Sequence, residues 1–201
     1  MSRQLETRIY AVIENWLRDK GYFVKQMRGM RGVGQADVIG MRAVGTKYYV
    51  EPEVVSVEVK KSKRGLGRKV TQALRYSLFS HLSYAAVPFR GARSFSELDK
   101  DIARKLGVGL LEVHERDDVR EVLSPSYHTP ARANILKILR RLGYIQCVLS
   151  GCISNKDGAR RMKRATELYG EKKLHKYLCR ECAPLLKLLK HANHVRKGRT
   201  K

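Results

Sequence analysis

Apolar side chains recur along the chain with two different periods, and the changes of period mark the expected elements. Between residues 2 and 19 they recur every three or four positions, which is the spacing of an amphipathic helix. From residue 22 onward the apolar runs are short and bounded by glycine, as in strands. The pattern predicts strands at 22–27, 36–41, 53–60, 84–89, 107–113 and 119–123, and helices at 67–81 and 94–106, the last capped by Ser94 or Ser96.

The order of these elements predicts an α/β fold around a mixed central sheet. The strand pattern ends near Pro125, and the residues after it favour helices at 130–142, over much of 156–178 and at 183–194. We therefore expect two domains, a core of residues 1–125 and a mainly helical module of residues 126–201.

Charge indicates the class of partner. Lys and Arg number 42 against 19 Asp and Glu, a net charge of +23. Residues 1–125 hold 23 basic and 15 acidic side chains, a net +8, and residues 126–201 hold 19 and 4, a net +15. Such an excess favours DNA or another polyanion, because each neutralised phosphate releases counterions. An acidic membrane surface or a generally solvated basic surface are the alternatives.

The N-terminal segment indicates the cellular compartment of the protein. Charged residues interrupt the first helix, so it has no continuous apolar run of signal-peptide length. No other stretch has the composition of a membrane span. We expect an intracellular, cytoplasmic protein that does not enter a membrane.

The third predicted strand carries polar side chains on one face. Ser56, Glu58 and Lys60 alternate onto that face, while the valines between them take the other. Asp37 lies at the start of the neighbouring strand, where an antiparallel hairpin would set it beside Glu58. Two carboxylates near one amine suit Mg²⁺ or Mn²⁺. The lysine would orient or deprotonate a water, or neutralise developing charge; the alternative is a surface ion pair.

These residues resemble the signature of the PD-(D/E)xK nuclease superfamily, in which Asp37 is followed by Glu58-Val59-Lys60. The resemblance covers residues 1–125 and implies a restriction-endonuclease-like αβββαβ core. It implies that Asp37, Glu58 and the Val59 carbonyl hold Mg²⁺ or Mn²⁺ and that Lys60 positions water. An acid on the first helix, here Glu6, would support a second metal or a water.

The resemblance continues on the next predicted helix. Gln72 and Tyr76 look like the Q-x-x-x-Y element of RecB-type nucleases, and their spacing puts both on one helical face. The strand GQADVIG and the stretch VEVK are also similar to archaeal Holliday junction resolvases. This implies a metal-dependent DNA endonuclease of repair or recombination, and a two-fold dimer if it cuts junctions. The alternative is a non-catalytic nucleic-acid-binding protein on the same scaffold.

Clustered basic residues are candidates for phosphate contacts. Two lie in a glycine-rich loop, which is otherwise only a hairpin connection. Three precede or open the helix after the third strand, whose first N–H groups favour anions. Four belong to a basic run in the second domain. The candidates are Arg28 and Arg31, then Arg64, Arg68 and Lys69, then Arg160, Arg161, Lys163 and Arg164.

All four cysteines lie in the second domain, in two close pairs: Cys147 with Cys152, and Cys179 with Cys182. Close pairs on a small basic module favour a structural zinc site with four thiolate ligands, which would replace a core the segment is too short to build. Disulfides and plain buried thiols are the alternatives.

Overall fold

A computed structural model describes most of the chain. It covers residues 2–26, 36–45, 50–60, 66–89, 91, 95–114, 118–147, 151–155, 160–162 and 176–178. Of residues 2–7, 50, 66–69, 155, 160–162 and 176–178 it describes the backbone alone. The chain forms two compact units, residues 1–42 with 52–138, and residues 43–51 with 139–201.

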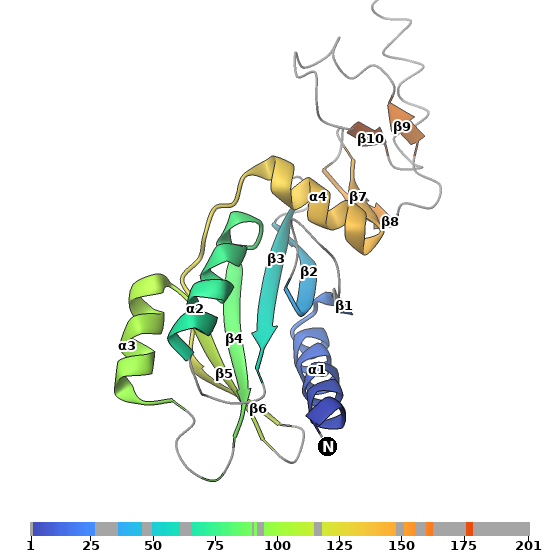
Figure 1. The fold of residues 1–201 in the computed structure, drawn as a ribbon. Coiled ribbons are helices and arrows are strands. Elements are labelled where there is room, and N and C mark those ends of the chain that lie inside the picture. Colours follow the sequence, from blue (N-terminus) through green and yellow to red (C-terminus); the bar gives the residue numbers. More distant parts are fainter. Residues whose placement is uncertain are drawn as a thin grey trace, which may run out of the picture. The chain divides into compact units, whose positions relative to one another are not determined.

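The central sheet has six strands in the order β1-β2-β3-β4-β5-β6 (Figure 1). Strands β3, β4 and β5 run parallel, and β6 returns antiparallel to β5. Only four residues join β2 to β3, too few for a crossover, so this pair is antiparallel. The strands are β1 (Phe23–Gln26), β2 (Val38–Gly45), β3 (Val50–Val59), β4 (Leu82–Pro88), β5 (Gly109–Val113) and β6 (Val119–Leu123).

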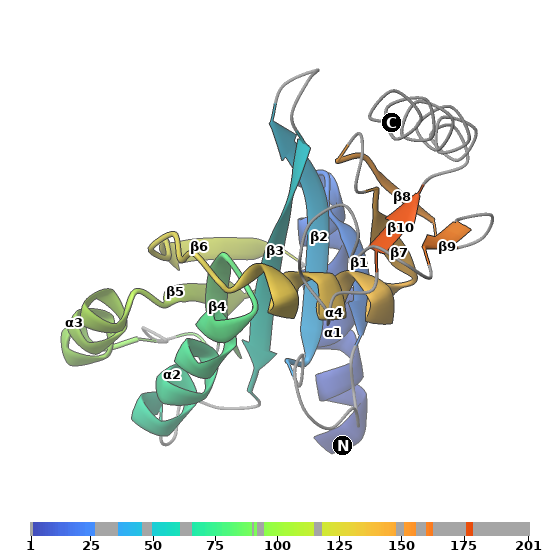
Figure 2. The same cartoon turned by 90° about the horizontal axis from the view of Figure 1, so that it is seen from above.

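Helices cover both faces of this mixed sheet, so the fold is α/β, as predicted. The helix α1 (Ser2–Asp19) packs on one face, where Ile9, Ile13 and Leu17 meet the odd-numbered valines of β3. On the other face lie α2 (Leu66–Leu74) and α3 (Glu97–Leu106), which pack against β4 and β5 (Figure 2). Both faces of β3 are therefore covered, and Ser56 and Glu58 are buried as fully as the valines on the other face.

The elements predicted for residues 1–125 occur in the predicted order, with their boundaries shifted by a few residues. The helix expected at 67–81 stops at Leu74 and continues as the 3₁₀ helix η1 (Arg75–Leu78). The two strands of the central hairpin extend further toward their connecting turn than their apolar runs suggest, β2 to Gly45 and β3 back to Val50. Pairing with a neighbour extends a strand past its apolar run, because it satisfies backbone groups whatever the side chain.

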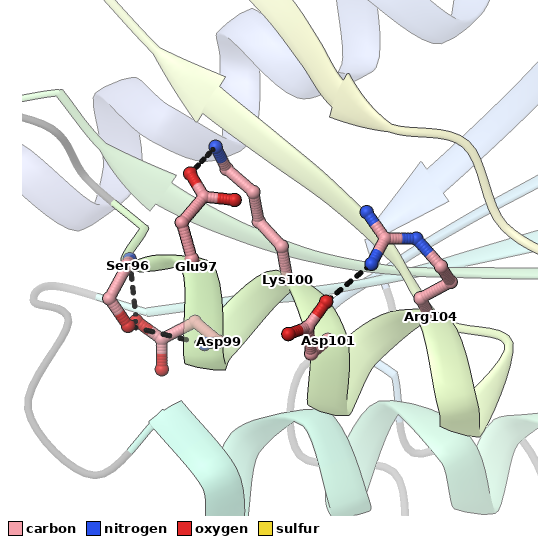
Figure 3. Close-up of polar contacts among 6 residues, drawn as sticks. All are labelled: Ser96, Glu97, Asp99, Lys100, Asp101 and Arg104. Atoms are coloured by element: carbon pink, nitrogen blue, oxygen red, sulfur yellow. Dashed lines mark hydrogen bonds and ion pairs between the residues drawn. The ribbon is translucent and has the colours of Figure 1, made fainter.

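Helix α3 shows how local sequence fixes an element (Figure 3). Ser96 is the N-cap, and its hydroxyl and the carboxylate of Asp99 form a capping box. Two exposed ion pairs follow the helix surface, Glu97 with Lys100 and Asp101 with Arg104. Past its end, the left-handed Gly107, with φ of 67°, turns the chain into β5. Ser96 rather than Ser94 is therefore the cap.

The described part of the second unit contains short paired strands. Helix α4 (Arg132–Leu142) leads into β7 (Tyr144–Gln146), which pairs with β8 (Ile153–Asn155), and β9 (Arg160–Met162) pairs with β10 (Lys176–Leu178). The helix predicted over much of 156–178 is therefore wrong at β9 and β10. Antiparallel pairing between distant residues overrides local helical spacing there. The helix expected at 183–194 lies outside the described residues.

None of the described helices is both long enough and apolar enough to cross a membrane.

Candidate functional site

The candidate site lies where β3 ends. Glu58, 1% exposed, sits on the face covered by α2, and Lys60 follows directly after the strand. Asp37 comes just before β2, and its carboxylate accepts a hydrogen bond from the Val59 N–H at 2.8 Å. The hairpin thus brings together Asp37, Glu58 and Lys60, which are separated in the sequence but neighbours in the fold.

Four side chains, one of them Glu58, form a closed ring of hydrogen bonds. Lys60 pairs with one carboxylate oxygen of Glu58, and the hydroxyl of Tyr76 donates to the other. The amide of Gln72 donates to Tyr76 at 3.2 Å and accepts from the Lys60 amine at 3.4 Å. Each member therefore restrains two others, and the carboxylate of Glu58 is held in one orientation.

Asp37 is shifted toward its protonated form. Its pKa is raised from 3.8 to about 6, first because burial removes water from the carboxylate and second because the charge of Glu58 lies close by. The Val59 N–H, the Lys60 amine and a hydrogen bond with Tyr10 act in the opposite direction. Tyr10 is a buried residue of α1, so the first helix also reaches this carboxyl.

The phenol of Tyr76 also favours its protonated form. Burial raises its pKa, and the hydrogen bond to Glu58 raises it further, because ionisation would set two negative charges together. At neutral pH Tyr76 is therefore a fixed donor to Glu58. It is carried by η1, the 3₁₀ turn that replaces the predicted end of α2.

Three buried serines lie beneath this turn. The hydroxyls of Ser56, Ser80 and Ser83 lie within 2.8–3.2 Å of one another, and each side chain is fully buried. Ser80 also donates to the carbonyl oxygen of Tyr76 at 2.8 Å. Ser56 is two residues before Glu58 on the same strand face, so this serine cluster ties the turn that bears Tyr76 to the strand that bears Glu58.

The charges of the site suit a divalent cation. Two carboxylates face one ammonium, which leaves one negative charge uncompensated when Asp37 is ionised. Carboxylate oxygens are the ligands that Mg²⁺ and Mn²⁺ prefer, and such ions often bind through only two of them plus water and substrate phosphate. Within the described part of the chain no group of three or more His, Cys, Asp or Glu side chains gathers. Asp37 and Glu58 are the two acids that the described residues bring together here.

A second buried acid on β3 shows what is particular to Glu58. Glu53 also binds a tyrosine and a cation: the Tyr22 hydroxyl donates to it at 2.5 Å and the Arg42 guanidinium at 2.7 Å. Its residue number is odd, so it belongs to the α1 face of the sheet. One acid and one guanidinium balance there, whereas at the β3 end Lys60 faces two acids.

The remaining predicted site residues are only partly described. Glu6 belongs to α1, Arg68 and Lys69 to α2, and Arg160 and Arg161 to β9. Only the backbone of these residues is described. Arg28, Arg31, Arg64, Lys163 and Arg164 lie outside the described residues.

Sequence reasoning missed Tyr10, Ser80 and Ser83. Tyr10 lies on the apolar stripe of α1, where its spacing looks like that of any core residue. Ser80 and Ser83 follow η1 and meet Ser56 only through the pairing of β3 with β4, which sets Ser56 beside Ser83. The alternation that places Ser56 on the face of Glu58 is the one signal that could have found this cluster.

Of the predicted zinc ligands, Cys147 and Cys152 are described. The Cys147 N–H donates to the Cys152 carbonyl oxygen at 2.8 Å, and the Gly151 N–H donates to the Cys147 carbonyl oxygen at 2.9 Å. These bonds set the backbones of Cys147 and Cys152 beside each other, and Gly151 has φ of 69°. Cys179 and Cys182 lie outside the described residues.

Compared with known protein families and with curated proteins, the chain matches none.

Proposed function

We propose that the chain is a metal-dependent DNA endonuclease that hydrolyses phosphodiester bonds, acting on branched or structured DNA in repair or recombination. The observation that supports this most is the meeting of Asp37, Glu58 and Lys60 at the end of β3, with Glu58 held by Tyr76. Two acids beside one amine match the residues that the PD-(D/E)xK resemblance implies. The net charge of +23 supports DNA as the partner.

In the proposed reaction a water oxygen bonds to phosphorus while the bond from phosphorus to one bridging oxygen breaks. Asp37 and Glu58 would hold Mg²⁺ or Mn²⁺ with the Val59 carbonyl, and such an ion polarises phosphoryl oxygens and lowers the pKa of bound water. Lys60 orients the attacking water or offsets charge that develops on the phosphate. Tyr76 and Gln72 keep the Glu58 carboxylate and the Lys60 amine in place. The water loses one proton, and the departing oxygen gains one.

The remaining parts of the proposal rest on the sequence. The basic module of residues 126–201 would bind DNA, and its four cysteines, Cys147, Cys152, Cys179 and Cys182, would bind a structural zinc ion. Glu6 would assist the metal site. The protein would work in the cytoplasm, as a homodimer if its substrate is a four-way junction, since a two-fold dimer presents paired sites.

A panel of DNA forms tests this function. Purified protein is incubated with a four-way junction, a flap, a duplex and a single strand, with Mn²⁺, with Mg²⁺ and with a chelator. We expect cleavage of at least one form, and only with metal. Failure to cut any form would leave the competing function, a non-catalytic DNA-binding protein.

Matched variants of β3 separate catalysis from folding. Glu58→Gln and Lys60→Ala are expected to lower cleavage by roughly a hundredfold or more, the range seen when a charge-stabilising group is removed. Glu53→Gln is the control, because Glu53 is buried on the same strand and also binds a tyrosine and a cation. It should cut at nearly the wild-type rate. Equal losses in Glu58→Gln and Glu53→Gln would point to a structural role for both.

A further inference from the structure

Two polar residues, Glu112 and His114, lie two strands away from Lys60, at the same edge of the sheet. The Lys60 N–H donates to the Ala86 carbonyl oxygen at 2.9 Å, which continues the parallel β3–β4 pairing and sets Lys60 opposite Val87. Val87 in turn pairs with Glu112 of β5. Because neighbouring strands lie about 4.8 Å apart, the backbones of Lys60 and Glu112 are roughly 10 Å apart along this edge.

His114 stands directly after β5 and is held from two sides. Its ring stacks on the ring of Phe89, with centroids 4.4 Å apart and planes 26° from parallel. Its Nε2 atom lies 3.7 Å from a carboxylate oxygen of Glu112. The Glu112 side chain is 7% exposed and that of His114 27% exposed. A buried acid and an aromatic ring thus fix an imidazole that still reaches solvent.

The position of His114 favours an anionic ligand. Strands β3, β4 and β5 all end at this edge, and α2 and α3 begin there, after β3 and β4 respectively (Figure 1). In open α/β sheets ligands bind outside the carboxyl ends of parallel strands, and helix N-termini carry partial positive charge. By strand alternation Glu112 and His114 share the face of Glu58.

We propose that His114, held by Phe89 and Glu112, binds a backbone phosphate of the DNA near the phosphodiester at Asp37 and Glu58. The placement of this second phosphate rests on the proposed function, although the contact itself is measurable without cleavage. The separation of roughly 10 Å between the backbones of Lys60 and Glu112 corresponds to about three nucleotide steps along a duplex axis. Contacts of this kind set the register of DNA on a protein and carry no sequence information.

Binding measured in a chelator tests the contact. A fluorescently labelled four-way junction and a duplex are titrated with wild type, His114→Ala and His114→Arg over a range of salt. His114→Ala should bind both DNAs roughly three- to tenfold more weakly. His114→Arg, which places a permanently cationic donor at the same position, should bind at least as tightly as wild type. Arg104→Ala is the control, because Arg104 is exposed near the end of α3, at the opposite edge of the sheet.

The outcomes separate this contact from the nuclease activity. With Mn²⁺ we expect His114→Ala to raise KM by about the same factor as Kd and to leave kcat within about twofold. If wild type cuts no DNA, the proposed function fails, and the binding comparison still decides the role of His114. If His114→Ala binds like Arg104→Ala, or if His114→Arg binds no better than His114→Ala, His114 is not a phosphate contact.

Discussion

The Tyr76 hydroxyl donates a hydrogen bond to the Glu58 carboxylate from a turn 18 residues further along the chain. Tyr76 is buried and its pKa is raised, so it remains a donor throughout the pH range of an ordinary assay. Tyr76 binds one carboxylate oxygen of Glu58, and Lys60 pairs with the other. The orientation of a candidate metal ligand thus depends on a residue that would touch neither metal nor substrate.

Replacement of Tyr76 by Phe should therefore impair cleavage more than stability. We expect kcat to fall roughly tenfold and the Mn²⁺ concentration for half-maximal activity to rise, because supporting partners of a metal ligand typically contribute 10- to 100-fold. Tyr84→Phe is the matched control: the Tyr84 hydroxyl also donates to a carboxylate, that of Glu121, at 3.1 Å. Metal titrations of both variants check this, and equal losses would contradict it.

Asp37 should make the metal-free protein less stable as pH rises. Its pKa is about 6 in the folded chain against 3.8 ordinarily, so the folded state holds the proton more tightly. The stabilisation of the fold by this proton is complete below about pH 4 and is lost as pH rises through about 6. The total loss in the free energy of unfolding is roughly 2 to 3 kcal/mol. Asp37→Asn, which keeps an acceptor for the Val59 N–H, should remove this dependence.

Thermal unfolding in a chelator provides the measurement. Asp37→Asn should melt higher than wild type at about pH 8 and at nearly the same temperature at about pH 4, while losing cleavage. Asp99→Asn is a useful comparison, because Asp99 is an exposed carboxylate of the α3 capping box and should lower the melting temperature at neutral pH instead. A stabilisation by Asp37→Asn that is equal at both pH values would refute the assignment.

The sequence predicts the framework of this site well because the framework rests on local patterns. Valine alternation in β3 puts Glu58 on the face opposite the valine core, and the glycine-bounded runs place Asp37 on the adjoining strand. The capping box at Ser96 is likewise a signal within four residues. Each depends on the side-chain period of one element, which a single sequence displays directly.

What the sequence does not predict depends on contacts between distant residues. The serine cluster needs the β3–β4 register, and Tyr10 reaches Asp37 only because α1 packs over the hairpin. The same reason explains β9 and β10, where pairing between residues 160–162 and 176–178 prevails over helical spacing. The periodicity of one element does not specify which distant strand it will pair with.

Zinc content tests the cysteine prediction. Backbone hydrogen bonding sets Cys147 beside Cys152, and four thiolates would bind about one zinc per chain. Elemental analysis of protein purified without chelator should show that ratio. Cys147→Ser and Cys179→Ser should each lose the metal and lower the melting temperature, because zinc binding contributes directly to folding. Zinc well below one per chain in wild type, or disulfides found by thiol titration, would exclude the site.

The serine cluster should affect activity through Ser80 in particular. The Ser80 hydroxyl bonds both to its two serine partners and to the Tyr76 carbonyl, whereas among the described residues the Ser83 hydroxyl bonds to the two serines. Ser80→Ala and Ser83→Ala should each destabilise the fold by about 1 to 3 kcal/mol, because each leaves a buried partner unsatisfied.

At a temperature where both serine variants are folded, Ser80→Ala should lower kcat further than Ser83→Ala, since it releases the turn that orients Tyr76 toward Glu58. The double variant of Ser80→Ala with Tyr76→Phe tests whether Ser80 acts on activity through Tyr76. If Ser80 acts through Tyr76, the double variant should lose little more activity than Tyr76→Phe alone. Fully additive losses would mean that the cluster supports the fold without positioning Tyr76.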